Sequence, residues 1–172
     1  MKLDRAKGFV VHHTDKTITI NGNTAPITAG LFVVTGIAKI ISLRGDVITA
    51  QLAANLTACQ LDIFPTGGAS VALTKVAGAP AIDSFEVGSL LGKFADVDKI
   101  LNVKRANVAI YAESGLNLED IPYTFKVGKK NGVVTTIRFL YTAGGDYSLE
   151  TGQIVWHCEW QPSSHDGHIA AA

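Results

Sequence analysis

Apolar and polar residues alternate with a period of two along most of this 172-residue chain, as they do in strands with one buried face. The alternation is clearest near the end, where one set of alternate positions is apolar and the other is mostly polar. The apolar set is Ile154, Trp156, Cys158 and Trp160, and the other set is Gln153, Val155, His157 and Glu159. No segment has the spacing of an amphipathic helix. The pattern therefore predicts an all-β protein with the first set of residues in its core.

Turn residues divide the chain into short segments that are rich in β-branched and aromatic residues. The predicted strands are 9–12, 17–20, 31–43, 47–52, 59–63, 69–76, 107–112, 123–127, 133–141 and 153–160. Glycine and proline interrupt residues 78–103, to which no structure is assigned. About ten strands with almost no helix favour a β-sandwich with jelly-roll-like connectivity, and a closed barrel is the alternative.

Four short segments predict how consecutive strands connect. Thr14-Asp15 is expected to join the first two strands in a small hairpin, and Arg44-Gly45-Asp46 is expected to form a turn. Gly36 interrupts a long strand and predicts a bulge or bend. The segment 129–132 contains Asn-Gly, which suits a tight hairpin between the strands 123–127 and 133–141.

The N-terminal hairpin is separated from the rest of the chain by residues 21–26, which break the alternation. We therefore predict three parts: an N-terminal arm or hairpin at 1–29, a β-sandwich body at 30–165 and a flexible tail at 166–172. The charged N-terminus is not followed by a continuous apolar run, so no secretory signal is expected and synthesis in a cytoplasm is predicted.

Charge and composition limit the expected partners. Fifteen basic and fifteen acidic residues cancel, so no net field draws the chain to nucleic acid or to an anionic membrane surface. Charged residues make up 17% of the chain, against about 25% in typical soluble domains, and no apolar stretch is long enough to span a bilayer. A chain with so little charge is expected to bury apolar surface between subunits, which predicts a homo-oligomer with no nucleic-acid or membrane partner.

The sequence contains no local signature of nucleophilic catalysis, such as a nucleophile elbow or a reactive thiol beside a histidine. Cys59 and Cys158 fall on predicted core faces, where a free cysteine behaves as a small hydrophobe. Strand alternation turns His157 away from Cys158. No spacing selects a catalytic pair among the carboxylates, of which we considered Asp83, Glu86, Glu113, Glu119 and Asp120. We therefore expect no enzyme, no catalytic residues and no cofactor.

A metal site was considered at the histidine-rich segment 165–168, with further ligands from His12-His13, because imidazole and carboxylate groups bind metal ions. The small residues that flank 165–168 indicate a mobile end, which rarely holds ligands in fixed geometry. Asp96 and Asp98 lack the glycine and the final glutamate of a calcium-binding EF-hand loop. No metal site is therefore predicted.

Two stretches contain glycines and aromatic residues in a distinctive order: 31–36 leading into 43–47, and 151–162. Together they resemble a widespread group of small virion proteins of tailed bacteriophages. Those proteins often open with a Phe/Val-Thr-Gly strand, continue through a glycine-bearing turn and a β-rich middle, and end with a Gly-x-Ile-x-Phe/Trp-x-Cys-x-Trp strand. The resemblance spans residues 30–162, and the irregular middle, 83–103, departs from the pattern.

The resemblance implies a structural component of the virion that decorates or cements the head, or that sits at a vertex or neck. The implied partners are further copies of the chain, with a trimer favoured by analogy, and the phage major capsid protein or neighbouring virion proteins. The N-terminal hairpin is expected to attach by strand addition to a neighbour. The alternative is a carbohydrate- or receptor-binding module of a fibre or spike, whose candidate aromatic residues are Tyr111, Tyr123 and Tyr147.

Overall fold

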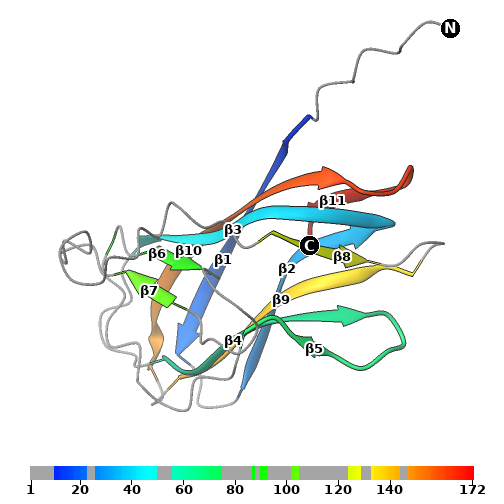
Figure 1. Cartoon of the computed structure of the whole chain (residues 1–172). Helices are drawn as coiled ribbons and strands as arrows, with labels where there is room; N and C mark the ends of the chain where they lie inside the picture. The colour runs from blue at the N-terminus through cyan, green and yellow to red at the C-terminus, as the bar shows by residue number, and fades with distance from the viewer. Residues whose placement is uncertain are drawn as a thin grey trace, which may run out of the picture.

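The computed structural model describes residues 10–22, 26–49, 56–74, 87, 90–92, 102–104, 124–128, 133–143 and 147–172. These residues contain no helix, and 77% of them lie in strands. The strands form two antiparallel sheets, which confirms the predicted all-β sandwich (Figure 1). The jelly-roll-like connectivity stays a prediction. No helix in the described part of the chain is long and apolar enough to cross a membrane.

The first sheet has six strands and is built around β10. Its strands are β1 (His12–Gly22), β3 (Ile37–Thr49), β6 (Leu90–Gly92), β7 (Asn102–Lys104), β8 (Phe125–Gly128) and β10 (Tyr147–Pro162). Their order is β1-β10-β3-β6-β7, and β8 pairs with the first residues of β3. The strand β10 is therefore an inner strand, with β1 on one side and β3 on the other.

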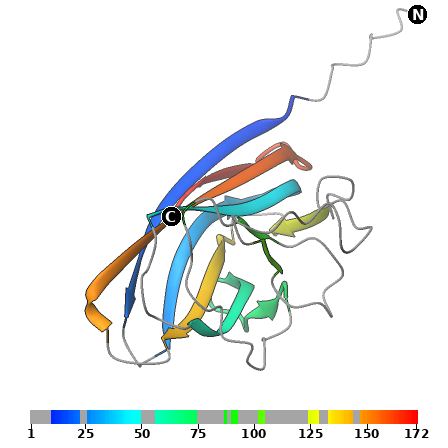
Figure 2. The ribbon, with the colours of Figure 1, turned by 90° about the vertical axis from the view of Figure 1, so that its left-hand side faces the viewer.

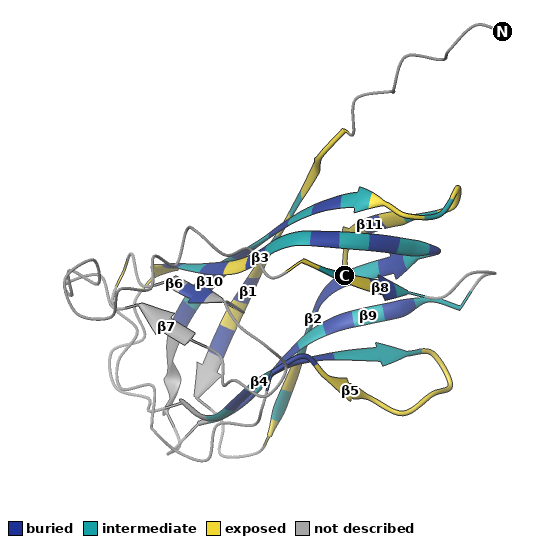
Figure 3. Ribbon diagram, viewed as in Figure 1, coloured by how far each residue is buried: buried dark blue, intermediate teal, exposed yellow. Residues whose placement is uncertain are grey.

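The second sheet has five strands in the order β11-β2-β9-β4-β5. They are β2 (Ile27–Thr35), β4 (Leu56–Pro65), β5 (Val71–Ala72), β9 (Thr135–Ala143) and β11 (His168–Ala171). The view in Figure 2 shows the two sheets lying face to face. Buried and less buried positions alternate along the strands, as Figure 3 shows for β3, β9 and β10.

The core lies between the sheets and takes alternate residues from each of the long strands. From β10 it receives Ile154, Trp156, Cys158 and Trp160, none of which is more than 4% exposed, so the predicted core face is confirmed. The ring centroid of Trp156 lies 5.3 Å from that of Phe139 in the second sheet. An aromatic pair of this kind contributes about 0.5–1.5 kcal/mol beyond the area it buries, so it helps to hold the two sheets together.

Gly36 is the corner at which the chain leaves one sheet and enters the other. The predicted single strand at 31–43 is wrong, because β2 ends at Thr35 and β3 begins at Ile37 in the opposite sheet. Gly36 has a φ of 60°, a conformation that glycine adopts without a steric penalty. A Cβ atom on Gly36 would lie 2.6 Å from the backbone carbon of Asp166, so a side chain would displace the turn that covers this corner.

The predicted turn at 44–46 is also wrong, because β3 continues through these residues. Gly45 is buried and lies directly opposite Trp156 on β10. A Cβ atom on Gly45 would lie 2.9 Å from the side chain of Ile154 and 3.1 Å from the indole of Trp156. The glycine is therefore explained by the close approach of an aromatic ring to the strand, and no turn is needed to account for it.

Longer-range pairings replace the two predicted hairpins. The strand β8 pairs with β3, whereas both edges of β9 are occupied by β2 and β4, so β8 and β9 lie in different sheets. Residues 12–22 form one strand that pairs with β10 from end to end, so the turn expected at Thr14-Asp15 does not occur. Ile18 and Ile20 of β1 belong to the core, which makes this strand part of the sandwich and not a separate arm.

The end of the chain is a strand and not the predicted flexible tail. The strand β11 pairs with β2, and Ile169 in its middle is only 2% exposed. The Thr14 hydroxyl connects β11 to the first sheet, because it donates to the carbonyl of Ile169 at 3.3 Å and accepts from the indole N–H of Trp160 at 3.1 Å. These contacts and the burial of Ile169 fix the end of the chain against the core.

The other predicted strands have mixed outcomes. Residues 59–63 lie within β4, and 47–49 are the end of β3. The predicted strand at 69–76 contains β5, which is only two residues long. The predicted strand at 107–112 lies outside the described residues, as does most of 78–103.

Candidate functional site

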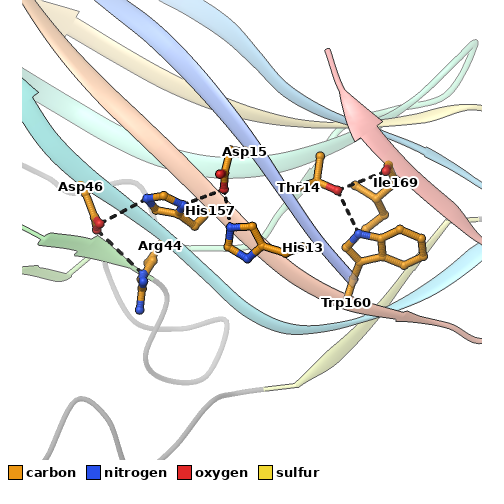
Figure 4. A network of polar contacts seen from close by, with 8 residues as sticks. All are labelled: His13, Thr14, Asp15, Arg44, Asp46, His157, Trp160 and Ile169. Carbon is orange, nitrogen blue, oxygen red and sulfur yellow. Dashed lines mark hydrogen bonds and ion pairs between the residues drawn. The ribbon is translucent and has the colours of Figure 1, made fainter. Parts of the chain in front are cut away.

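A polar network crosses the outer face of the first sheet, from β1 over β10 to β3 (Figure 4). Asp15, His157 and Arg44 occupy directly paired positions on these three strands. His13 and Asp46 lie two residues away, on the same face of β1 and β3 respectively, because strand side chains alternate. We name these five residues the His157 network.

Short contacts join the members of the network in one row. Oδ1 of Asp15 lies 2.6 Å from Nε2 of His13 and 2.7 Å from Nδ1 of His157. On the other side of the ring, Nε2 of His157 lies 3.2 Å from Oδ2 of Asp46. The row ends at Arg44, whose Nε lies 3.9 Å from Oδ1 of Asp46. A histidine on the inner strand β10 thus connects carboxylates from both neighbouring strands.

Both ring nitrogens of His157 face carboxylate oxygens, Nδ1 that of Asp15 and Nε2 that of Asp46. Burial acts to raise the pKa of Asp15, but the hydrogen bonds and the positive charges of His157 and His13 together hold that pKa below its usual value of 3.8. The network is therefore built around an ionised carboxylate.

The network is covered at its centre and open towards β1. The side chain of His157 is 20% exposed and that of Asp46 is 31% exposed, whereas those of His13 and Asp15 are 49% and 50% exposed. Oδ1 of Asp46 is buried and accepts no hydrogen bond from a described residue. The inner half of the network is thus fixed by its surroundings, and the outer half is accessible to solutes.

Three members of the network form the one group of described residues that could hold a metal ion. His13 Nε2, Asp15 Oδ1 and His157 Nδ1 all lie within 4.8 Å of one another. Two imidazole nitrogens and a carboxylate oxygen are ligands that zinc and neighbouring transition metals accept. The structure therefore brings together a ligand set in a chain for which the sequence predicted no metal site.

The metal site considered from the sequence is not formed by the described residues. Asp166 accepts a hydrogen bond within its own turn at 2.6 Å. The ring of His12 stacks on Trp160 at 4.5 Å between centroids, and His168 lies edge-on to the same indole at 5.6 Å. Of the candidates named from the sequence, only His13 belongs to the ligand group.

Sequence interpretation missed Asp15 and His157 as partners of His13. His13 and Asp15 are two residues apart, which is the signal for one face of a strand, but Asp15 was assigned to a turn. His157 was assigned correctly to the face of the last strand that points away from the core. The missing information is the register that places Asp15 opposite His157, 142 residues later in the chain.

The two cysteines are free and buried, as predicted. Burial raises the pKa of Cys59 to about 12 and that of Cys158 to about 12, and the negative charge of Glu159 contributes to the second shift. Neither thiol is therefore ionised at neutral pH, and neither lies at the surface where a thiolate could act as a nucleophile.

A second polar system, on β4 and β9, has a different character. Asp62 and Arg138 are directly paired, and the guanidinium donates from Nε to Oδ1 at 2.8 Å and from a terminal nitrogen to Oδ2 at 2.5 Å. The carboxylate is 4% exposed and the guanidinium 20%. The ring of Phe64 covers the guanidinium, with 4.3 Å between its centroid and the Cζ atom of Arg138. Nothing in the spacing of Asp62 and Arg138 along the sequence indicates this buried pair, because the two residues are 76 positions apart.

Some candidates named from the sequence lie outside the described residues, and no role is assigned to them. They are Asp83, Glu86, Asp96, Asp98, Tyr111, Glu113, Glu119, Asp120 and Tyr123, together with the side chain of Tyr147. Both tryptophans are buried at the core face of β10, so neither presents a ring on which a sugar could stack.

A hollow lies beside β8. Lys39, Lys126, Gln161, Pro162 and Ser163 line it. The two lysines are directly paired across β3 and β8. The hollow offers positive charge but no nucleophile with a neighbouring base, so it does not indicate catalysis.

The fold defines the class of the protein as an all-β sandwich. The sequence matches no protein-family model, and comparisons with curated proteins and with solved structures find no match.

Proposed function

We propose that the chain is a non-enzymatic structural protein of a tailed-bacteriophage particle, which decorates or stabilises the capsid as an oligomer. One observation carries the proposal. The glycines and aromatic residues that resemble those of phage virion proteins each have a structural role in the sandwich. Gly36 forms the corner between the sheets, Gly45 receives an indole, and Trp156, Cys158 and Trp160 fill the core. The residues that carry the resemblance therefore maintain the fold and do not form a catalytic site, as expected of a protein that works through its shape and contacts.

The outer edge of β1 supports assembly by strand addition. In the described part of the chain, β1 pairs with β10 on one side only, so its other edge presents backbone groups to a partner. Val10 and Val11 precede this edge and are 65% and 51% exposed. A strand from a neighbouring copy would pair with the backbone of β1 and cover the two valines.

The proposal includes the finer features that the resemblance implies. These are jelly-roll-like connectivity, a trimer, a location in the virion, and the major capsid protein or a neighbouring virion protein as partner. A low content of charged residues, 17%, supports the burial of surface between subunits.

The mass of the purified full chain in solution, measured by light scattering, tests the oligomer. We expect a stable oligomer for the wild-type chain and a monomer for the double variant Val10→Asp with Val11→Asp, because charges at a strand edge oppose strand addition. Val71→Asp is the matched control, since Val71 is 54% exposed beside the edge of the other sheet, and this variant should keep the wild-type mass. Point substitutions are used in place of a deletion of residues 1–24, because that deletion would remove β1 and its core residues and so damage the fold itself.

Electron microscopy of the wild-type chain mixed with capsid shells of the candidate phage tests the virion role. Decoration of the shells by the wild-type chain, and loss of decoration in the double variant, would support the proposal. A monomer that ignores capsid shells would contradict it and would favour the carbohydrate- or receptor-binding module, which selective binding on a glycan array would then support.

A further inference from the structure

We propose that His13, Asp15 and His157 form a binding site for a divalent transition-metal ion such as Zn²⁺, on the outer face of the first sheet. This inference does not rest on the proposed virion role. His13 and Asp15 point to the same side of β1, and His157 on β10 lies directly opposite Asp15. The ligands thus come from two hydrogen-bonded strands, and paired strands hold their side chains at fixed spacings.

The present distances from the Asp15 carboxylate to the two imidazoles are hydrogen-bond distances. Oδ1 of Asp15 lies 2.6 Å from Nε2 of His13 and 2.7 Å from Nδ1 of His157, as in hydrogen bonds. A tetrahedral Zn²⁺ with bonds of about 2.0–2.1 Å needs about 3.3 Å between ligand atoms, so the side chains must separate by about 0.7 Å. His13 and Asp15 are half exposed and have room for this movement. The ion would take the place of the two close contacts that Asp15 now makes with the imidazoles.

Asp46 gives an independent reason to assign a ligand role to His157. Histidines that bind metals usually donate their other N–H to a carboxylate, which fixes the orientation of the ring and leaves the first nitrogen free for the ion. Nε2 of His157 lies 3.2 Å from Oδ2 of Asp46, while Nδ1 faces the proposed site. Arg44, 3.9 Å from the other oxygen of Asp46, adds a charge that holds this carboxylate in place.

The ligand types determine which ions fit. Imidazole nitrogens favour Zn²⁺, Ni²⁺, Cu²⁺ and Co²⁺, whereas Ca²⁺ and Mg²⁺ prefer sites made of oxygen atoms. Three protein ligands leave a fourth tetrahedral position empty of protein, and the exposed side of His13 and Asp15 gives water or an outside ligand access to it. The site is therefore of the open type, and Mg²⁺ or Ca²⁺ should not compete for it.

Titration of the full chain with Zn²⁺, followed by calorimetry, tests the proposal, and the absorption spectrum of bound Co²⁺ reports the coordination. The protein must be made without a histidine tag. We expect saturation at one ion per chain, a release of protons on binding, and displacement of Co²⁺ by Zn²⁺ but not by Mg²⁺. His13→Ala and Asp15→Asn should each abolish this binding, because each removes one of three ligands. Both side chains are half exposed, so these variants are expected to fold.

His165→Ala is the matched control, because His165 is exposed and lies in a turn outside the ligand group. This variant should bind Zn²⁺ as the wild-type chain does. Asp46→Asn should keep the stoichiometry and weaken the affinity about 10- to 100-fold, as is usual when a carboxylate partner of a metal-binding histidine is lost. The proposal is overturned if the wild-type chain binds no Zn²⁺, or if binding survives in His13→Ala and Asp15→Asn.

Discussion

Each sheet carries a polar system in which charges from neighbouring strands meet, and the two systems differ in how firmly they are closed. On the second sheet, Asp62 and Arg138 form a bidentate pair whose carboxylate is 4% exposed. On the first sheet, His157 lies between two carboxylates, and the side chain of Asp15 is 50% exposed. The hydrogen bond to Asp62 raises the pKa of Arg138, so the charge of that guanidinium is permanent, whereas the charge of a histidine depends on its proton.

This difference in closure indicates that the Asp62–Arg138 pair stabilises the fold, whereas the His157 network can bind a metal ion. A closed pair of permanent charges holds two strands in register and has no free position for another group. An open system built on imidazoles can give up protons to a metal ion, because each deprotonated ring nitrogen then becomes a ligand. We therefore expect substitutions in the first system to change stability, and substitutions in the second to change binding.

The largest effect is expected for Arg138→Met, which leaves the buried carboxylate of Asp62 without its partner. The free energy of unfolding should fall by about 3–5 kcal/mol, measured by urea denaturation, because an unpaired buried charge is strongly destabilising. Arg44→Met is the matched control, since the Arg44 side chain is 50% exposed, and its loss should stay below about 1 kcal/mol. Similar losses for both arginines would remove the contrast between the two systems.

Where the two sheets face each other, their residues should be buried to a similar degree. The two buried thiols, one from each sheet, test this expectation. Cys59 and Cys158 have pKa values near 9.0 when unfolded and about 12 when folded, so the folded chain keeps protons that the unfolded chain releases. Their contribution to stability is full below pH 9 and is lost as the pH rises towards 12. At pH 10 the loss is expected to be about 1 kcal/mol for each thiol.

Urea denaturation at pH 7.5 and pH 10 measures this alkaline loss. Cys59→Ala and Cys158→Ala should each remove a similar part of it, because each sheet contributes one thiol to the core. A loss that disappears with one cysteine alone would mean that the two sheets bury their thiols unequally.

The smallest effect is expected for Asp15→Asn in protein kept free of metal by a chelator. Asp15 is half exposed, so its hydrogen bonds should contribute no more than about 1 kcal/mol at pH 7. Because folding lowers the pKa of Asp15, this contribution is present above the unfolded value of 3.8 and disappears as the pH falls below it. Urea denaturation at pH 7 and pH 3 should therefore show a larger difference between variant and wild type at pH 7 than at pH 3. A loss of several kcal/mol would make this network as structural as the Asp62 pair.

Alternation along single strands was enough to predict the all-β class and the buried face of β10. The same pattern identified the core positions of Cys59, Cys158 and both tryptophans, because a period of two states which side chains share a face. Ile18 and Ile20 of β1 follow the same period, and the face they share enters the core.

Neighbour relations between strands could not be predicted in the same way, because a period of two does not identify the adjacent strand. The segment before β9 contains Asn-Gly, which favoured a local hairpin, yet β8 found its partner in β3. Gly45 was assigned to a turn because the indole that explains it lies more than a hundred residues later. The candidate metal site depends on the same long-range register, since Asp15 and His157 meet only when β1 pairs with β10.

The pairing of β1 with β10 also has a consequence for how the chain folds. The strand β10 separates β1 from β3, so the first sheet cannot be completed until β10, which begins at Tyr147, has been synthesised, long after β3 has ended at Thr49. Contacts of such high sequence separation require long loops to close first, which places folding in the range of about milliseconds to seconds. Until then the edges of β1 and β3 that pair with β10 stay open on the ribosome, and aggregation of nascent chains competes with folding.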